Sequence, residues 1–155
     1  MIYQRTHRGK RGFTFDVVEH QRMINPQNNQ PIYRIFTALR NNKYAGEMYL
    51  DYDLQGVSLY DPRAVRRNDI GISEFGVRKD LRGKGIGSTL LKKAERIAKR
   101  NKKDRLILST LKSNTRAQKL YRKQGFEKIG EFQHLDRLAD GSKKKRTLIM
   151  MAKKV

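Results

Sequence analysis

A glycine-rich stretch in the middle of the chain constrains the fold more than any other segment. Residues 75–87 read Phe-Gly-Val-Arg-Lys-Asp-Leu-Arg-Gly-Lys-Gly-Ile-Gly and lead from a strand-like run into a helical pattern. The first turn of a helix carries unpaired backbone N–H groups and a partial positive charge, which attract phosphate oxygens. Glycines let the main chain approach a ligand closely. We expect an anion-binding loop, the alternative being an ordinary strand-to-helix connection. The loop residues are Arg82, Gly83, Lys84, Gly85, Ile86 and Gly87.

The segments on either side of this loop show two regular patterns. Before it, apolar residues occupy positions 70 and 72 and then 75 and 77, so the strand alternation slips by one residue near Glu74. An extra residue, a β-bulge, leaves such a slip, and bulges free backbone groups for ligands. After the loop, apolar residues recur at helical spacing up to residue 100, with charged residues on the opposite face. The apolar face consists of Ile86, Leu90, Leu91, Ala94, Ile97 and Ala98.

The first half of the chain has the alternation of antiparallel strands. Apolar residues alternate with polar ones over residues 13–17 and 33–39, on either side of a polar turn at residues 25–31. Asn41-Asn42 is a turn signal before a further strand at residues 44–50. These patterns predict a β-meander, followed by one more extended piece at residues 57–60.

The second half continues with a buried strand, a short helix and a hairpin. Residues 106–108 are apolar on both faces of the strand. Asn114 is a suitable N-cap for a second helix, and Gly125 suits the left-handed position after its end. Residues 126–132 and 146–152 read as a closing β-hairpin, whose basic end is most simply a solvated turn.

Length and composition favour one small cytoplasmic domain. The chain has 155 residues, and we expect residues 1–155 to form a single domain. No apolar run reaches the ~18 residues of a membrane span, and no signal peptide is apparent. There is no cysteine, and the three histidines have no metal-ligand spacing, so we expect neither a disulfide nor a bound metal.

Positive charge is concentrated in the half that contains the glycine-rich loop. The formal net charge is +21; residues 1–80 hold 13 basic and 9 acidic residues (+4), and residues 81–155 hold 23 and 6 (+17). One phosphorylated cofactor needs only a few of these charges. The surplus indicates a polyanionic partner, such as nucleic acid, or simply solubility. No zinc finger, basic zipper or RNA-recognition strand motif accompanies the charge.

Two motifs together carry a family resemblance. Residues 77–100, with Arg-Gly-Lys-Gly-Ile-Gly, are followed by Asn114-Thr115-Arg116-Ala117-Gln118-Lys119-Leu120-Tyr121 and Gly125-Phe126. In this order and spacing they resemble the acetyl-CoA-binding core of the GNAT superfamily of N-acetyltransferases, over residues 70–131. The resemblance implies a mixed α/β fold: a twisted, mostly antiparallel central sheet flanked by helices, with a β-bulge before the glycine-rich loop.

The same resemblance implies roles for individual residues. The amides of residues 82–87 would bind the pyrophosphate of acetyl-CoA, and backbone N–H groups at Phe75, Gly76 and Val77 would bind the pantetheine arm and polarise the thioester carbonyl. Tyr121 matches the tyrosine that protonates the departing thiolate, and Asn114 matches a position that hydrogen-bonds the cofactor. Glu74 is the candidate general base. The alternatives are that Tyr121 is a core residue, that Asn114 is only a helix cap and that Glu74 is a surface carboxylate.

The sequence argues against two other kinds of phosphate-binding protein and leaves a third function as a rival hypothesis. A dinucleotide-binding motif and a kinase-type phosphate loop both fail on glycine spacing. A non-enzymatic, GNAT-like basic module that binds nucleic acid or a ribosomal surface remains the rival hypothesis. The acceptor amine, a small molecule or a protein, is not specified by the sequence. Family members usually place two helices between their first two strands, whereas residues 19–30 are too few and too polar for such a pair, so the acceptor site is open or is completed by a second subunit in a homodimer.

Overall fold

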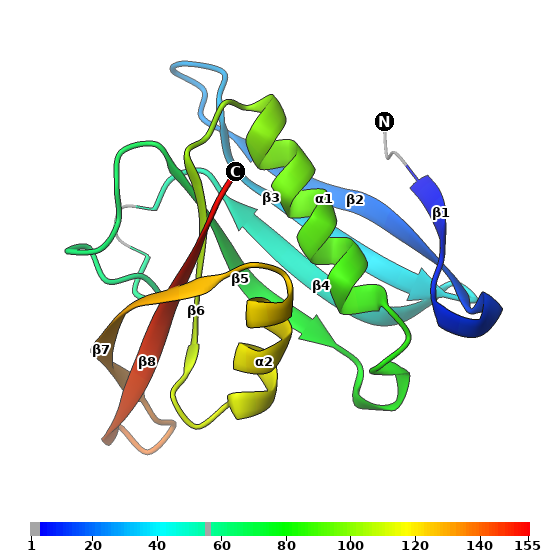
Figure 1. Cartoon of the computed structure of the whole chain (residues 1–155). Coiled ribbons are helices and arrows are strands. Elements are labelled where there is room, and N and C mark those ends of the chain that lie inside the picture. Colours follow the sequence, from blue (N-terminus) through cyan, green and yellow to red (C-terminus); the bar gives the residue numbers. More distant parts are fainter. Residues whose placement is uncertain (1–3, 55–56) are drawn as a thin grey trace.

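The computed structural model describes residues 4–54 and 57–155, which form one eight-stranded sheet and two α-helices (Figure 1). Two single-turn 3-10 helices, η1 (Lys10–Gly12) and η2 (Lys79–Leu81), lie in connections. The helices are α1 (Ile86–Arg100) and α2 (Thr115–Lys123). The strands are β1 (Gln4–Arg8), β2 (Thr14–Ile24), β3 (Pro31–Arg40), β4 (Lys43–Asp51), β5 (Asp69–Val77), β6 (Arg105–Leu111), β7 (Glu127–Arg137) and β8 (Lys143–Lys154).

The sheet is antiparallel apart from one neighbouring pair. Its strand order is β1-β2-β3-β4-β5-β6-β8-β7, and only β5 and β6 run parallel. A parallel pair needs a crossover connection, and α1 provides it. The expected mixed α/β fold with a mostly antiparallel sheet is therefore confirmed.

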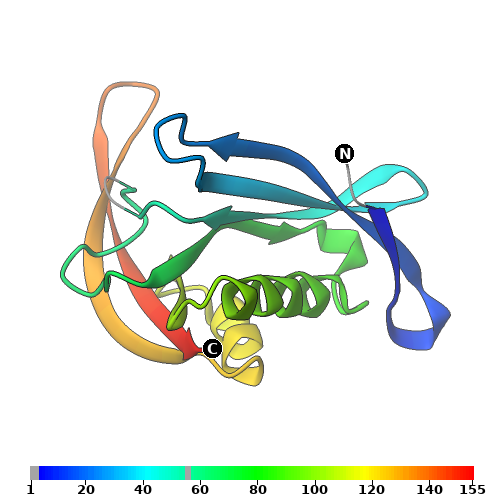
Figure 2. The same ribbon diagram turned by 90° about the horizontal axis from the view of Figure 1, so that it is seen from above.

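Both helices lie on the same side of the curved sheet (Figure 2). All six residues of the predicted apolar face of α1 are buried, from 0% exposure at Leu90 to 7% at Ile97. Each large aliphatic side chain buried in this way stabilises the fold by roughly 1.5–3 kcal/mol. Leu106, Ile107 and Leu108 of β6 are at most 1% exposed, which confirms a strand buried on both faces.

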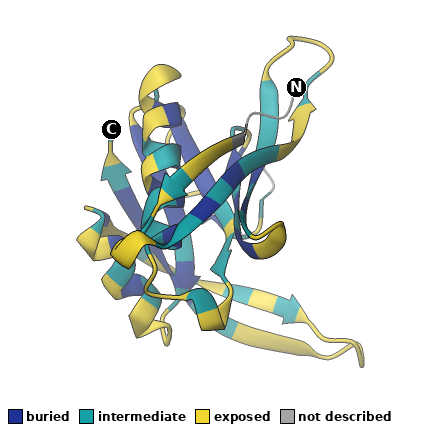
Figure 3. Ribbon diagram, turned by 90° about the vertical axis from the view of Figure 1, so that its right-hand side faces the viewer, coloured by how far each residue is buried: buried dark blue, intermediate teal, exposed yellow. Residues whose placement is uncertain are grey.

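The strand pattern departs from the sequence prediction in three places. Residues 57–60 form a turn, closed by a 3.2 Å hydrogen bond from the Tyr60 N–H to the Val57 carbonyl, so the predicted extended piece was wrong. The sequence pattern did not indicate β1. The closing hairpin is longer than predicted, because polar residues continue its ladder to Arg137 and Lys143. Its outer part carries no buried residue, and Figure 3 shows this arm extending from the core.

The connection between β2 and β3 is short. Residues 25–30 form a turn held by hydrogen bonds from the Asn25 N–H to the Gln30 carbonyl (2.8 Å) and from the Asn29 N–H to the Asn25 carbonyl (2.9 Å). The structure describes the whole segment from β2 to β3, and it contains no helix between these strands. The predicted absence of a helix pair here is confirmed.

Candidate functional site

The site begins where the parallel strands β5 and β6 separate. Their ladder runs from Asp69 opposite Arg105 to Ile72 opposite Leu108 and ends there. Both strands continue, β5 to Val77 and β6 to Leu111, paired on their other edges with β4 and β8. A gap therefore opens between two neighbouring strands of one sheet, and the backbone edges that face it are not paired with each other.

A β-bulge at Glu74 accompanies this separation. Ser73 lies opposite Tyr49 and Gly76 lies opposite Glu47, so β5 has two residues, 74 and 75, opposite a single residue of β4. Glu74 has φ +46°, in the left-handed region that non-glycine residues rarely adopt. The predicted bulge is confirmed at its predicted position.

The glycine-rich loop leads from the end of β5 to α1. Gly83 and Gly85 have φ of +76° and +97°, a conformation that other residues adopt only with strain. Gly85 is the N-cap of α1 and provides no side-chain cap, so the N–H groups of the first turn point from the helix end without a capping partner among the described residues. The glycine conformations and the uncapped start of α1 are as the sequence predicted, and the binding of an anion there stays a prediction.

Gly87 is suited to its position by close packing, whereas Gly83 and Gly85 are suited to theirs by their backbone conformation. A Cβ at this position would lie 3.3 Å from Cζ of Phe75 and 3.5 Å from Cδ2 of Leu120. Its missing side chain therefore lets α1 pack against Phe75 of the bulged strand, whereas the sequence predicted that it clears space for a ligand.

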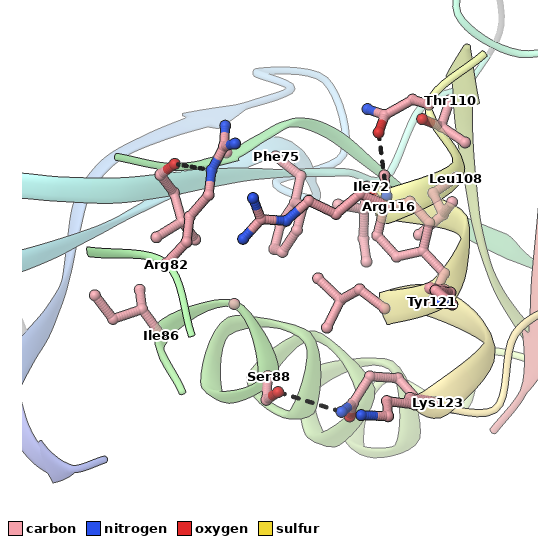
Figure 4. A pocket seen from close by; sticks show the side chains of 18 of the residues that line it. Ile72, Phe75, Arg82, Ile86, Ser88, Leu108, Thr110, Arg116, Tyr121 and Lys123 are labelled. Atoms are coloured by element: carbon pink, nitrogen blue, oxygen red, sulfur yellow. Dashed lines mark hydrogen bonds between the residues drawn. The ribbon is translucent and has the colours of Figure 1, made fainter. Parts of the chain in front are cut away.

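A pocket of about 1310 Å³ joins the strand gap to the glycine-rich loop (Figure 4). Its walls are the second half of β5, the loop, the first turn of α1, the end of β6 and one face of α2. It contains eleven of the twelve predicted site residues; the exception is Lys84, whose carbonyl accepts a hydrogen bond from the Lys10 N–H. The eleven are Glu74, Phe75, Gly76, Val77, Arg82, Gly83, Gly85, Ile86, Gly87, Asn114 and Tyr121.

Basic side chains surround this pocket. Among the described residues its lining includes six basic side chains and one acidic residue, Glu74. Figure 4 shows Arg116 extending from α2 into the pocket, with Arg82 on the opposite side, held by a 3.2 Å hydrogen bond from its Nε to the Val77 carbonyl. The six are Lys10, Arg82, Arg116, Lys119, Arg122 and Lys123. The pocket is suited to a ligand with several negative charges.

Tyr121 lies on α2 at the edge of the strand gap. The residue is 5% exposed, and the centroid of its ring lies 5.8 Å from that of Phe75 and 6.1 Å from that of Phe126. Burial raises the pKa of Tyr121 to about 12, so its hydroxyl keeps its proton at neutral pH. Within the described chain no group hydrogen-bonds that hydroxyl, which is therefore available to donate to a ligand in the pocket.

Asn114 has a role in the local structure, as the cap of α2, whereas Glu74 is an exposed residue at the bulge. The Asn114 side chain accepts a 3.1 Å hydrogen bond from the Ala117 N–H, which confirms the predicted N-cap of α2. Glu74 is exposed at the bulge and lines the pocket. Burial is the main cause of the raised pKa of Tyr49 and of Asp51, and the negative charge of Glu74 is a lesser cause in each case.

Several residues that line the pocket were not among those predicted from the sequence. Lys119 and Lys123 follow Arg116 at spacings of three and four, which places them on one side of α2, and this spacing was a usable signal. Lys10 and Leu59 come from the β1–β2 turn and the β4–β5 connection, and nothing in their local sequence indicated the pocket.

The described residues contain neither a candidate metal site nor a candidate membrane-spanning helix. In the described ranges no three His, Cys, Asp or Glu side chains lie close enough together to hold a metal ion. No helix in those ranges has the length and hydrophobicity needed to cross a membrane.

Comparison with known proteins identifies the family. Residues 3–126 match the model of the acetyltransferase (GNAT) family. The uncharacterized N-acetyltransferase YobR of Bacillus subtilis is 29% identical over 108 residues, which cover 70% of this chain and 42% of YobR. The chain thus spans less than half the length of this curated relative.

Solved structures share the fold. An IAA acetyltransferase from Bacillus cereus is 22% identical, with a TM-score of 0.62, covering 80% of this chain and 79% of that one. A GNAT family acetyltransferase from Elizabethkingia anophelis, solved with acetyl-CoA bound, is 20% identical, with a TM-score of 0.60 and coverage of 80% and 77%. At these identities the likeness concerns the fold.

Proposed function

The chain belongs to the GNAT family of acetyltransferases, and we propose that it transfers the acetyl group of acetyl-CoA to a primary amine. The observation that carries this proposal is the pocket, in which a gap between parallel strands meets an uncapped helix N-terminus. Such a helix end suits a diphosphate, and a narrow gap lined by unpaired backbone edges suits an extended chain that contains amides.

The pocket residues fit this cofactor. The N–H groups of residues 85–87 and the side chain of Arg82 are suited to the diphosphate, and the cationic side chains of α2 add further attraction for phosphate. A Cβ at Gly83 or Gly76 would meet no atom within 4 Å, so the backbone at both positions is open to the pocket. We propose that the N–H groups of Phe75, Gly76 and Val77 bind the pantetheine arm.

Three groups of this chain would carry the chemistry. When bound, acetyl-CoA supplies an acetyl group activated as a thioester. Glu74 would accept the proton that the acceptor ammonium must lose before its nitrogen can attack. The backbone N–H groups at the bulge would stabilise negative charge on the carbonyl oxygen. The Tyr121 hydroxyl would donate its proton to the sulfur as the carbon–sulfur bond breaks, a role for which its buried, protonated state is suitable.

The acceptor would approach from the side of the bulge. Leu59 of the β4–β5 connection and Glu74 line the pocket there, whereas the glycine-rich loop begins after Val77, the last residue of β5, and leads into α1. Only residues 25–30 connect β2 to β3, so among the described residues no helix lies between these two strands. We propose an open acceptor cleft that admits a large amine, such as a protein N-terminus or lysine, as well as a small one.

Thermal unfolding with acetyl-CoA, CoA or ADP at two salt concentrations tests the cofactor site. Ligand at about 100 times its Kd should stabilise the protein by about 2.7 kcal/mol. Stabilisation by acetyl-CoA that persists at high salt supports the proposal, and mass spectrometry of candidate amines incubated with acetyl-CoA then identifies the acceptor. Absence of stabilisation, or an effect that any polyanion reproduces and salt abolishes, would refute it.

A further inference from the structure

The turn between β1 and β2 packs against the glycine-rich loop. The Lys10 N–H donates a hydrogen bond to the Lys84 carbonyl at 3.1 Å. The neighbouring Gly9 lies so close that a Cβ there would be 2.2 Å from the same carbonyl oxygen. A Cβ on Gly85, the N-cap of α1, would lie 3.7 Å from Cα of Gly9. Two segments that are about 70 residues apart in sequence thus meet through their backbones.

The turn itself is tightly held. The Gly9 N–H donates to the Phe13 carbonyl at 2.6 Å, and the Phe13 N–H donates to the Lys10 carbonyl at 3.1 Å. Arg11 and Gly12 both adopt left-handed backbone conformations, with φ of +53° and +75°. These constraints fix the position of the Lys10 backbone relative to the start of α1.

Lys10 is one of the residues that line the pocket at this end. Its side chain is exposed, and none of the ion pairs among the described residues includes it. The other basic residue at this end is Arg82, while the remaining four basic lining residues belong to α2 on the other side of the pocket. Lys10 therefore adds an exposed basic residue at the end of the pocket where the N–H groups of α1 emerge.

We propose that Lys10 binds the diphosphate of CoA and that Gly9 is the positioning residue that lets the turn reach the loop. This inference rests on the proposed function, because it assigns a further residue to the same site. An ammonium beside a phosphate forms a charge-assisted hydrogen bond, and its loss should weaken binding about tenfold. The effect should be larger at low salt, because the Lys10 side chain is exposed.

Isothermal titration of the wild-type protein, Lys10→Ala and Arg8→Ala tests the proposal. Arg8 lies in the same hairpin, is exposed and does not line the pocket, so its removal costs the same charge without the proposed contact. Two probes are used: CoA, and acetyl-pantetheine, which lacks the diphosphate. We expect Lys10→Ala to weaken CoA binding about tenfold and leave acetyl-pantetheine binding unchanged, with Arg8→Ala resembling the wild type for both.

The outcomes separate this inference from the proposed function. Equal CoA affinity of Lys10→Ala and Arg8→Ala, with a wild type that binds CoA, would overturn the role of Lys10 alone. Equal loss with both probes would also overturn it, because the contact would then not concern the diphosphate. A wild-type protein that does not bind CoA overturns both proposals. Lys10→Gln, which keeps the aliphatic stem, should behave like Lys10→Ala if charge is what matters.

Discussion

Tyr60 donates a hydrogen bond of 2.8 Å from its hydroxyl to the carboxylate of Asp51, and both residues are buried. Ser73, the residue before the bulge, hydrogen-bonds the same carboxylate. The pair therefore fastens the β4–β5 connection to the end of β4, and Ser73 links the same carboxylate to β5, the strand that carries Glu74. That connection also contributes Leu59 to the proposed acceptor entrance.

Tyr60→Phe should destabilise the protein by about 1–3 kcal/mol at neutral pH, because it leaves a buried carboxylate short of a donor. Burial raises the pKa of Asp51, and losing the Tyr60 hydrogen bond should raise it further. A carboxyl group whose pKa is higher in the folded than in the unfolded state contributes less stability as the pH rises and the group ionises. The loss of unfolding free energy caused by Tyr60→Phe should therefore grow from about pH 4 to pH 8. Urea unfolding across this range measures it.

Tyr44→Phe is the matched control for Tyr60→Phe, because Tyr44 is 45% exposed. It should change the unfolding free energy by less than about 0.5 kcal/mol at every pH. A Tyr60→Phe defect that is the same at pH 4 and pH 8 would show that the hydroxyl does not act through the ionised carboxylate.

Glu19→Gln should remove an acid-dependent part of the stability. Burial alone would raise the pKa of Glu19, but hydrogen bonds from Arg34 and Arg22 outweigh it and lower the pKa to about 2. The shortest of these bonds joins Arg34 Nη2 to Glu19 Oε2 at 2.6 Å. A lowered pKa contributes stability that is present above the unfolded pKa and is lost as the pH falls toward 2.

The measurement for Glu19 is urea unfolding between about pH 2 and pH 7. The wild-type and Glu19→Gln curves should lie about 1–3 kcal/mol apart at neutral pH and converge in acid. Glu127→Gln, at an exposed position, is the control and should follow the wild type. Parallel curves for Glu19→Gln and the wild type would mean that the ion pair does not titrate as described.

The sequence predicted the cofactor side of this fold well, because there local pattern and tertiary contacts agree. The helical repeat gave α1 its observed bounds, and the phase slip at Glu74 is the visible trace of the bulge. Asn114 and Gly125 marked the ends of α2 through capping chemistry that depends only on neighbouring residues. These signals are local, and local signals can be read from a sequence.

The parts that were missed depend on partners distant in sequence. β1 has the sequence Gln-Arg-Thr-His-Arg, without an apolar alternation, and becomes a strand because β2 offers it an edge. Lys10 reaches the pocket only through the contact of its turn with Lys84. The polar ends of β7 and β8 pair with each other beyond the hydrophobic part that the sequence marks.

Tyr121→Phe should leave CoA binding and folding unchanged and lower kcat about 10²–10⁴-fold if Tyr121 is the general acid. The fold should tolerate the change, because no described group hydrogen-bonds the hydroxyl and the ring contacts with Phe75 and Phe126 remain. Burial raises the pKa of Tyr121 to about 12. At any pH below about 11, ionisation of Tyr121 should therefore not lower the kcat of the wild-type protein. Steady-state kinetics against pH, with CoA titration as the binding readout, measure both effects, and an unchanged kcat would exclude Tyr121 as the acid.

Gly9→Ala should destabilise the protein and weaken CoA binding together, because a Cβ at 2.2 Å from the Lys84 carbonyl oxygen must push the turn away from the loop. Overpacking of this kind costs roughly 1–3 kcal/mol. Gly130→Ala is the control: its Cβ would meet no atom within 4 Å, and its φ is not in the left-handed region. Urea unfolding and CoA titration of both variants test the coupling. If Gly9→Ala lost stability while CoA affinity stayed at the wild-type value, the turn would support the fold without positioning Lys10, since a displaced turn moves the Lys10 ammonium away from the diphosphate end of the pocket.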